Sequence, residues 1–188
     1  VKLKRVAICH SLGSHLIDQE VLHSATHVVL INSFSRFIPR SKDNRPMKLA
    51  LNRMMNAINT PNEEDMLRKF YIKAFKPNHI DVESIKSNLL HISDSGRLKL
   101  KNDLKVLINS ESLPIGLNSS AKVLIVNSEE DYILDNKTKS KLAEDLINHL
   151  DAAPKIINLK EEGHSITKIK NIIKIKQWLE FDHAKNMV

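Results

Sequence analysis

The chain has 188 residues, 41% of them hydrophobic and 27% charged, which is ordinary for one globular domain with a sizeable core. It contains no apolar run long enough to cross a bilayer and no leading secretion signal, so a cytoplasmic protein is expected. The net charge of +7 favours an acidic partner, but aromatic residues are only 4% and no nucleic-acid-binding motif is present, so neither nucleic acid nor a membrane is expected.

The chain opens with two short apolar runs, RVAIC at 5–9 and VVLIN at 28–32, separated by a helical stretch. Runs that are apolar on both faces are typical of buried parallel strands, and so short a crossover predicts neighbouring strands. The sequence therefore begins with a strand–helix–strand unit.

The middle of the chain, from residue 34 to about 109, is helical and basic with no clear strand. One helix is expected to begin at Thr60, with Thr60 as N-cap and Glu63 completing a capping box. Further helices are predicted over 82–90 and 98–108.

Strand–helix alternation resumes after the middle region. The predicted strands cover 122–127 and 155–159, and the predicted helices cover 137–150 and 166–180. The pattern predicts an α/β fold with a mostly parallel sheet and a helical insertion long enough to serve as a lid. Three segments are expected: residues 1–33 with the first strands, 34–118 with the insertion and its return, and 119–188 with the rest of the core.

The segment Cys9-His10-Ser11-Leu12-Gly13 joins a predicted strand to a predicted helix, as the G-x-S-x-G elbow of serine hydrolases does. Cys9, the only cysteine, replaces the first glycine and excludes an internal disulfide. Close approach of helix and strand is expected to require small flanking residues. Ser11 is the candidate nucleophile, and a helix N-cap is its structural alternative.

An acid and a histidine follow the later predicted strands in the chain order Ser, Asp, His that this arrangement requires. Asp131 comes just past 122–127, and His164 directly follows 155–159. Glu129 and Glu130 compete for the role of the acid, and Asp135 is a more distant candidate. A helix-starting acid and an ordinary loop histidine are the structural alternatives.

The segments AICHSLGSHL, HVVLINSFSRF, AKVLIVNSEEDYIL and EEGHSITK resemble those of α/β-hydrolases. Within that superfamily the chain is most similar to the pimeloyl-carrier-protein methyl ester esterases of biotin synthesis. The resemblance implies a partial α/β-hydrolase fold and hydrolysis of an ester carried by an acidic acyl carrier protein. It implies substrate contacts from His10, Phe34 and Phe37. Six basic residues are the implied docking sites for the carrier protein: Arg36, Arg40, Arg45, Arg53, Arg68 and Lys69.

The implied mechanism has His164, oriented by Asp131, remove the Ser11 proton as the hydroxyl attacks the ester carbonyl. The backbone N–H of Leu12 would bind the oxyanion, and no metal or organic cofactor is required. Rival functions that use the same residues are a thioesterase and a small-ester hydrolase. A non-catalytic module that binds a carrier protein remains a further alternative.

Only VKLKRVAIC and His10 precede Ser11, whereas the family places several strands and an oxyanion loop before the nucleophile. Loss of one oxyanion donor costs on the order of 100- to 1000-fold in turnover. A fragment or a gene model started too late is the favoured explanation, because Val1 fits an alternative start codon. A shortened enzyme that pairs its open edge in a homodimer, or a non-catalytic remnant, are the other two.

Overall fold

The structure is a computed structural model that describes residues 3–40, 44–79, 81 and 92–184. Its centre is a parallel sheet in the order β1-β2-β3-β4, formed by Val6–His10, His27–Ile31, Lys122–Ser128 and Lys155–Leu159. Each observed strand lies within one residue of its predicted bounds. The predicted α/β fold with a mostly parallel sheet is confirmed.

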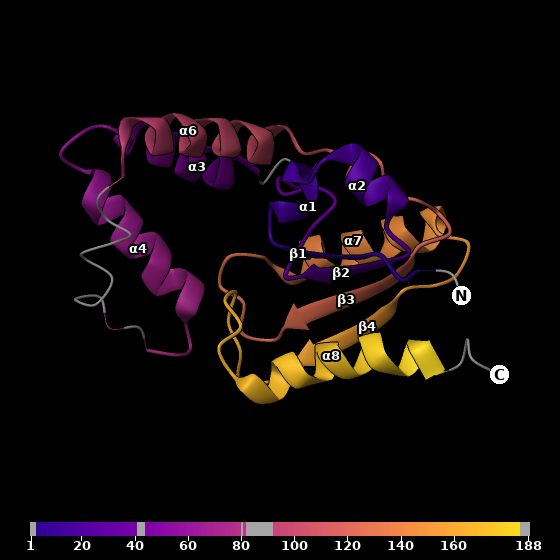
Figure 1. Cartoon of the computed structure of the whole chain (residues 1–188). Coiled ribbons are helices and arrows are strands. Elements are labelled where there is room, and N and C mark those ends of the chain that lie inside the picture. The colour runs from indigo at the N-terminus through magenta and orange to yellow at the C-terminus, as the bar shows by residue number, and fades with distance from the viewer. Residues whose placement is uncertain (1–2, 41–43, 80, 82–91, 185–188) are drawn as a thin grey trace.

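Helices cover the sheet from both sides (Figure 1). On one face, side chains that alternate along β1 to β3, such as Cys9 and Leu30, pack against α2 (Gln19–Ser24) and α7 (Asn136–His149). On the other face, Val29 and Leu124 pack against α8 (Ile169–Ala184). Cys9 is only 4% exposed, so the sulfur lies in the first of these two cores.

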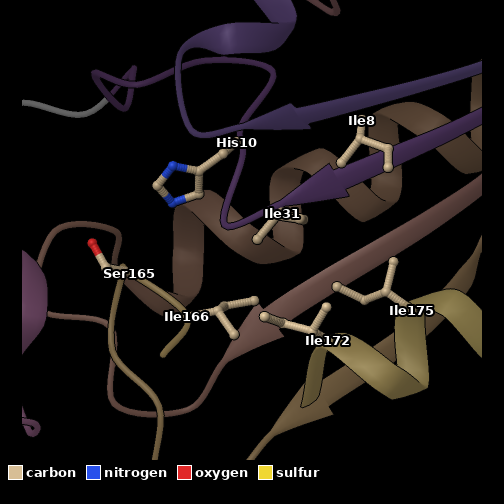
Figure 2. A pocket seen from close by; sticks show the side chains of 7 residues that line it. All are labelled: Ile8, His10, Ile31, Ser165, Ile166, Ile172 and Ile175. Carbon is tan, nitrogen blue, oxygen red and sulfur yellow. The ribbon is translucent and has the colours of Figure 1, made fainter. Parts of the chain in front are cut away.

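The second face of β1 is open along its length. Val6 and Ile8 are 42% and 58% exposed, and His10 at the end of the strand is also exposed. Beside them runs a groove of about 380 Å³ between the sheet and α8, in which isoleucine side chains from both sides face one another (Figure 2). Its lining consists of Ile8, His10, Ile31, Ser165, Ile166, Ile172 and Ile175.

The predicted helix after β1 is split in two. α1 covers only Gly13–Leu16, because Ile17 is extended, and α2 then begins with the Asp18 side chain accepting from the amides of Glu20 and Val21. A strong local N-cap at Asp18 therefore overrides the continuous apolar spacing.

The insertion forms three described helices, α3 (Arg45–Ala57), α4 (Glu63–Phe75) and α6 (Asp94–Asn109). α3 and α6 lie side by side, and α4 descends toward the carboxyl ends of the strands (Figure 1). The helix expected over 82–90 falls outside the described residues, and the predicted 98–108 is part of α6. α3 was not predicted as a separate helix.

α4 begins at Glu63 instead of Thr60, so the expected capping box does not form. The Glu63 carboxylate accepts from the Asn59 amide at 2.6 Å and from the Arg97 guanidinium at 2.9 Å. This pairing ties α4 to α6 inside the insertion. No helix in the described part of the chain is both long and apolar enough to cross a bilayer.

Candidate active site

The residue after β1, Ser11, turns the chain sharply. Its φ is +53°, a left-handed conformation that is uncommon for serine and marks a strained turn. The Ser11 amide donates to the Ile31 carbonyl at 2.9 Å, and the buried Ser33 hydroxyl donates to the Ser11 carbonyl, also at 2.9 Å. β2 and the loop after it therefore hold the elbow in place.

Gly13, at the start of α1, is not required to be small. A Cβ built at this position meets no heavy atom of the described structure within 4 Å. α1 does contact β1, but the expected close approach of helix and strand does not reach the position of a Cβ at Gly13.

The acid and the histidine lie in contact. Nδ1 of His164 donates to Oδ2 of Asp131 at 2.9 Å, and the two side chains are 3% and 0% exposed. Because the carboxylate can only accept, Nδ1 carries a proton, and in the uncharged form of the imidazole Nε2 keeps its lone pair. This is the tautomer that a general base for a hydroxyl requires.

Asp131 is itself fixed by its backbone surroundings. Its Oδ1 accepts from the amides of Ile133 and Leu134 at 2.7 and 3.0 Å. Burial raises the pKa of Asp131, but the hydrogen bond and charge of His164 and these two amides outweigh burial and hold the pKa below its usual range. The carboxylate therefore stays ionised.

The three competing acids lie elsewhere. Glu129 and Glu130 are exposed, and Asp135 serves as N-cap of α7 by accepting from the Thr138 amide at 2.7 Å. Among these four candidate acids, Asp131 is the one that the structure pairs with His164.

Two side chains that flank the elbow hold the backbone of His164. Its carbonyl oxygen accepts from Nδ2 of Asn32 at 2.7 Å and from Nε2 of His10 at 2.8 Å. The rings of His10 and His164 lie 4.9 Å apart, and His10 also reaches one end of the isoleucine groove (Figure 2). His10 is exposed as a whole residue, but its ring is partly buried against His164, and this desolvation lowers the pKa of His10 and favours the neutral ring.

Glu162, two residues before His164, was not foreseen from the sequence. Its fully buried carboxylate accepts from the Lys168 amide at 2.8 Å and from Nδ2 of Asn171 at 2.9 Å. Nδ2 of Asn78, from the segment after α4, reaches the same carboxylate at 3.3 Å. The carboxylate thus joins the segment 160–168 between β4 and α8, which carries His164 and is called the histidine loop below, to α8 and to the insertion.

Phe34 and Phe37 lie inside the insertion's core, where their rings make an edge contact at 5.2 Å. Both are buried, and Leu12 packs against the same cluster. His15 of α1 stacks on Phe34 and donates to its carbonyl oxygen at 2.9 Å. The insertion is therefore packed directly onto the elbow, with the two phenylalanines as part of its core.

The six candidate docking residues are spread over three segments. Arg36 and Arg40 follow β2, where Arg36 donates to the Glu111 carbonyl and Arg40 pairs with the Glu111 carboxylate. Arg68 and Lys69 pair with acids one turn earlier on α4. Arg45 and Arg53 are exposed on α3.

The parallel sheet, the left-handed serine turn and the paired acid and histidine at strand ends define a partial α/β-hydrolase fold. The structure is similar to an esterase from Exiguobacterium antarcticum, with 13% identity, a TM-score of 0.67, and coverage of 96% of this chain and 67% of that one. It is also similar to 2-hydroxy-6-oxo-6-phenylhexa-2,4-dienoate hydrolase from Rhodococcus sp. strain RHA1, with 14% identity, a TM-score of 0.64, and coverage of 95% and 64%.

A third similar structure is an α/β hydrolase enzyme from a Medee basin deep-sea metagenome library, with 17% identity, a TM-score of 0.62, and coverage of 90% and 62%. The chain thus spans 62–67% of the length of these three proteins. No protein-family model and no curated protein matches the sequence.

Proposed function

We propose that the chain carries the site of a serine carboxylesterase, with Ser11 as nucleophile, His164 as general base and Asp131 as the acid that orients it. The observation that carries the proposal is the buried 2.9 Å hydrogen bond between Asp131 and Nδ1 of His164. The bond leaves Nε2 of His164 as an acceptor, and the same loop is bonded to both strands that hold Ser11.

In the proposed reaction, Oγ of Ser11 attacks the ester carbonyl while Nε2 of His164 takes the hydroxyl proton. The ionised Asp131 stabilises the imidazolium that forms. The Leu12 amide, at the N-terminal end of α1 where amides have no partner within the helix, would donate to the oxyanion. The alcohol leaves with the proton from His164, and water then releases the acid from Ser11.

The first test is hydrolysis of p-nitrophenyl acetate and butyrate by the 188-residue chain, with Ser11→Ala as the matched variant. Hydrolysis that disappears in Ser11→Ala supports the proposal. Equal rates for the two proteins, or a folded wild-type chain that releases no nitrophenol above background, would refute an esterase function for this chain. With the Leu12 amide as its single proposed oxyanion donor, the chain should turn over about 100- to 1000-fold more slowly than an esterase that uses two.

As the natural substrate we propose the methyl ester of a pimeloyl group on an acyl carrier protein. The support is the sequence resemblance together with the basic charge of the insertion, including the exposed Arg45 and Arg53 of α3. The rival substrates are thioesters and small esters, which the same three residues would hydrolyse.

Charge reversal separates these substrates. Arg45→Glu combined with Arg53→Glu is expected to raise KM for the carrier-protein ester about tenfold and to leave p-nitrophenyl butyrate unchanged, because an acidic carrier needs the positive surface. Lys174→Glu on α8, away from the insertion, is the control. Equal effects on both substrates would exclude carrier docking at α3, and the small-ester alternative would then be favoured.

A further inference from the structure

Asn32 lies between the two loops of the candidate site. It is the first residue after β2, is fully buried, and has a φ of +42°. A left-handed backbone conformation costs free energy in any residue that has a Cβ, although asparagine tolerates it better than most residues. A buried amide in this position therefore calls for an explanation beyond packing.

The neighbours of Asn32 in the chain hold the serine. The Ile31 carbonyl accepts from the Ser11 amide, and the Ser33 hydroxyl donates to the Ser11 carbonyl, both at 2.9 Å. The two residues on either side of Asn32, Ile31 through its carbonyl and Ser33 through its side chain, thus hold the backbone N–H and C=O of Ser11. Any movement of this tripeptide would move the elbow with it.

The side chain of Asn32 holds the histidine loop and the strand that leads to the acid. Nδ2 donates to the carbonyls of His164 at 2.7 Å and Gly163 at 3.2 Å, and to the Ser128 hydroxyl at 2.9 Å. Oδ1 accepts from the Ser128 amide at 2.7 Å. Since an amide N–H can bond only to the oxygen end, this last contact fixes the NH₂ group toward the histidine loop.

We propose that Asn32 is a positioning residue. It holds the His164 backbone at a fixed place relative to Ser11 and Asp131, so that Nδ1 of the imidazole can bond to Asp131 while Nε2 can take the proton of Ser11. The proposal rests on the proposed function, because it assigns roles to these three residues. Asn32 acts through the backbone of residues 163 and 164 and touches no substrate. Its contribution is the fixed distance between the elbow and the base.

Asn32→Asp is the sharpest variant. Aspartate has the same shape, tolerates the left-handed backbone, and still accepts from the Ser128 amide. It places an acceptor oxygen opposite two carbonyl oxygens, however, so the histidine loop is repelled instead of held. Misplacement of a catalytic group by about 1 Å costs on the order of 100-fold, so kcat should fall about 100-fold with KM nearly unchanged.

Two matched variants isolate the effect. Asn158→Asp makes the same chemical change at an exposed position of β4 and should keep the wild-type kcat. Ser128→Ala removes one acceptor of the same amide but leaves both bonds to the histidine loop, so its loss should be at most a few-fold. A Ser128→Ala loss equal to that of Asn32→Asp would overturn the proposal, since general strand packing would then be responsible.

A proton NMR measurement tests the proposal without turnover. The Nδ1 proton of His164, hydrogen-bonded to Asp131, should give a low-field resonance in the wild-type chain. In Asn32→Asp this resonance should shift upfield or broaden from exchange, while Asn158→Asp keeps it. An unchanged resonance in Asn32→Asp would overturn the proposal even if the chain hydrolyses no ester.

The two proposals fail in distinguishable ways. If Ser11→Ala is inactive while Asn32→Asp keeps kcat within twofold of wild type, the positioning role is wrong and the esterase proposal stands. If Ser11→Ala matches wild type, the esterase proposal is wrong, and the resonance decides whether Asn32 fixes His164. Should Asn32→Asp fail to fold, Asn32→Gly, which suits the left-handed backbone, takes its place with the same expected losses.

Discussion

Asp131 fixes which nitrogen of His164 carries the proton. Asn in its place would offer an NH₂ group or an amide oxygen to Nδ1, and bonding through NH₂ stabilises the tautomer whose Nε2 is protonated and cannot act as a base. Asp131→Asn should therefore lower kcat by about 10⁴-fold with little change in the thermal midpoint. Stopped-time assays with p-nitrophenyl butyrate measure the loss.

The control for Asp131→Asn is Glu130→Gln, which makes the same change one residue away on an exposed side chain. It should keep wild-type kcat. If Glu130→Gln lost activity and Asp131→Asn did not, the acid of the site would have been assigned to the wrong residue.

Glu162 provides a pH-dependent stabilisation. Burial raises its pKa, but hydrogen bonds from Asn171, Lys168 and Thr167 outweigh burial and hold the pKa below its usual range. A carboxylate whose pKa is lowered by folding stabilises the fold above its unfolded pKa of about 4.3, and this stabilisation disappears as the pH falls through the lower folded value. The wild-type chain should therefore lose stability below about pH 5.

Glu162→Gln tests this dependence, because glutamine does not titrate. At pH 7 the variant should be less stable by about 1–3 kcal/mol, and its thermal midpoint should fall less than that of wild type between pH 5 and 3. Glu161→Gln, at an exposed neighbour, is the control. Parallel curves for wild type and Glu162→Gln would show that Glu162 is not the titrating group.

At the residue scale, the sequence reveals the candidate triad but not its supports. Apolar runs in the sequence predict the strands, and the three candidate residues follow the ends of those strands: Ser11, Asp131 and His164. Asn32 and Glu162 match no motif, and their roles depend on loops that meet only after folding. The one available signal for Asn32 is a polar residue that ends the apolar run VVLIN.

At the scale of elements, the C-terminal end of α4 packs closely against the histidine loop. The Ser165 amide donates to the Ala74 carbonyl at 2.9 Å, and a Cβ at Gly163 would lie 1.7 Å from the Lys76 carbonyl oxygen. Only glycine fits between these two backbones. The insertion is therefore packed directly against the loop that carries the candidate base, His164.

Gly163→Ala should force α4 and the histidine loop apart. A backbone oxygen cannot yield by 1–2 Å at low cost, so a loss of about 3 kcal/mol, or about 10 °C in Tm, is expected by differential scanning fluorimetry. Gly13→Ala is the control, because a Cβ there meets open space, and it should stabilise α1 by about 0.5–1 kcal/mol. Equal midpoints for the two variants would contradict the close contact at Gly163.

The elements differ in how far the sequence predicts them. Strands were located within one residue because buried parallel strands are short, continuous apolar runs. α3 was not predicted as a separate helix, although Met47, Leu51 and Met54 recur at helical spacing in it and pack in the core of the insertion. The continuous helix expected after the elbow was wrong because the Asp18 cap restarts it.

For the whole molecule, one face and the outer edge of β1 are uncovered in the described chain. Val6 and Ile8 leave apolar surface uncovered beside a strand whose outer edge has no described partner strand. Exposed apolar strand edges promote pairing between chains. We therefore expect this 188-residue chain to self-associate as its concentration rises.

Ile8→Lys should shift that association toward monomer, because a charge on β1 opposes burial of the edge. Sedimentation velocity over a hundredfold range of concentration measures the shift. Ile147→Lys on α7 is the matched control, since Ile147 is 57% exposed and Ile8 58%. A wild-type chain that stays monomeric throughout, or equal shifts in both variants, would exclude the β1 face as the contact.

The burial of Cys9 gives the chain an internal reporter of strand opening. The chain has no other cysteine, and burial raises the pKa of the Cys9 thiol, so the folded state should resist alkylation. Because Cys9 and Ser11 are two residues apart, we expect local unfolding that exposes the Cys9 sulfur to solvent to disrupt the turn at Ser11 as well. The slow labelling rate with iodoacetamide would thus measure how often the native chain loses the left-handed turn at Ser11, with no substrate present.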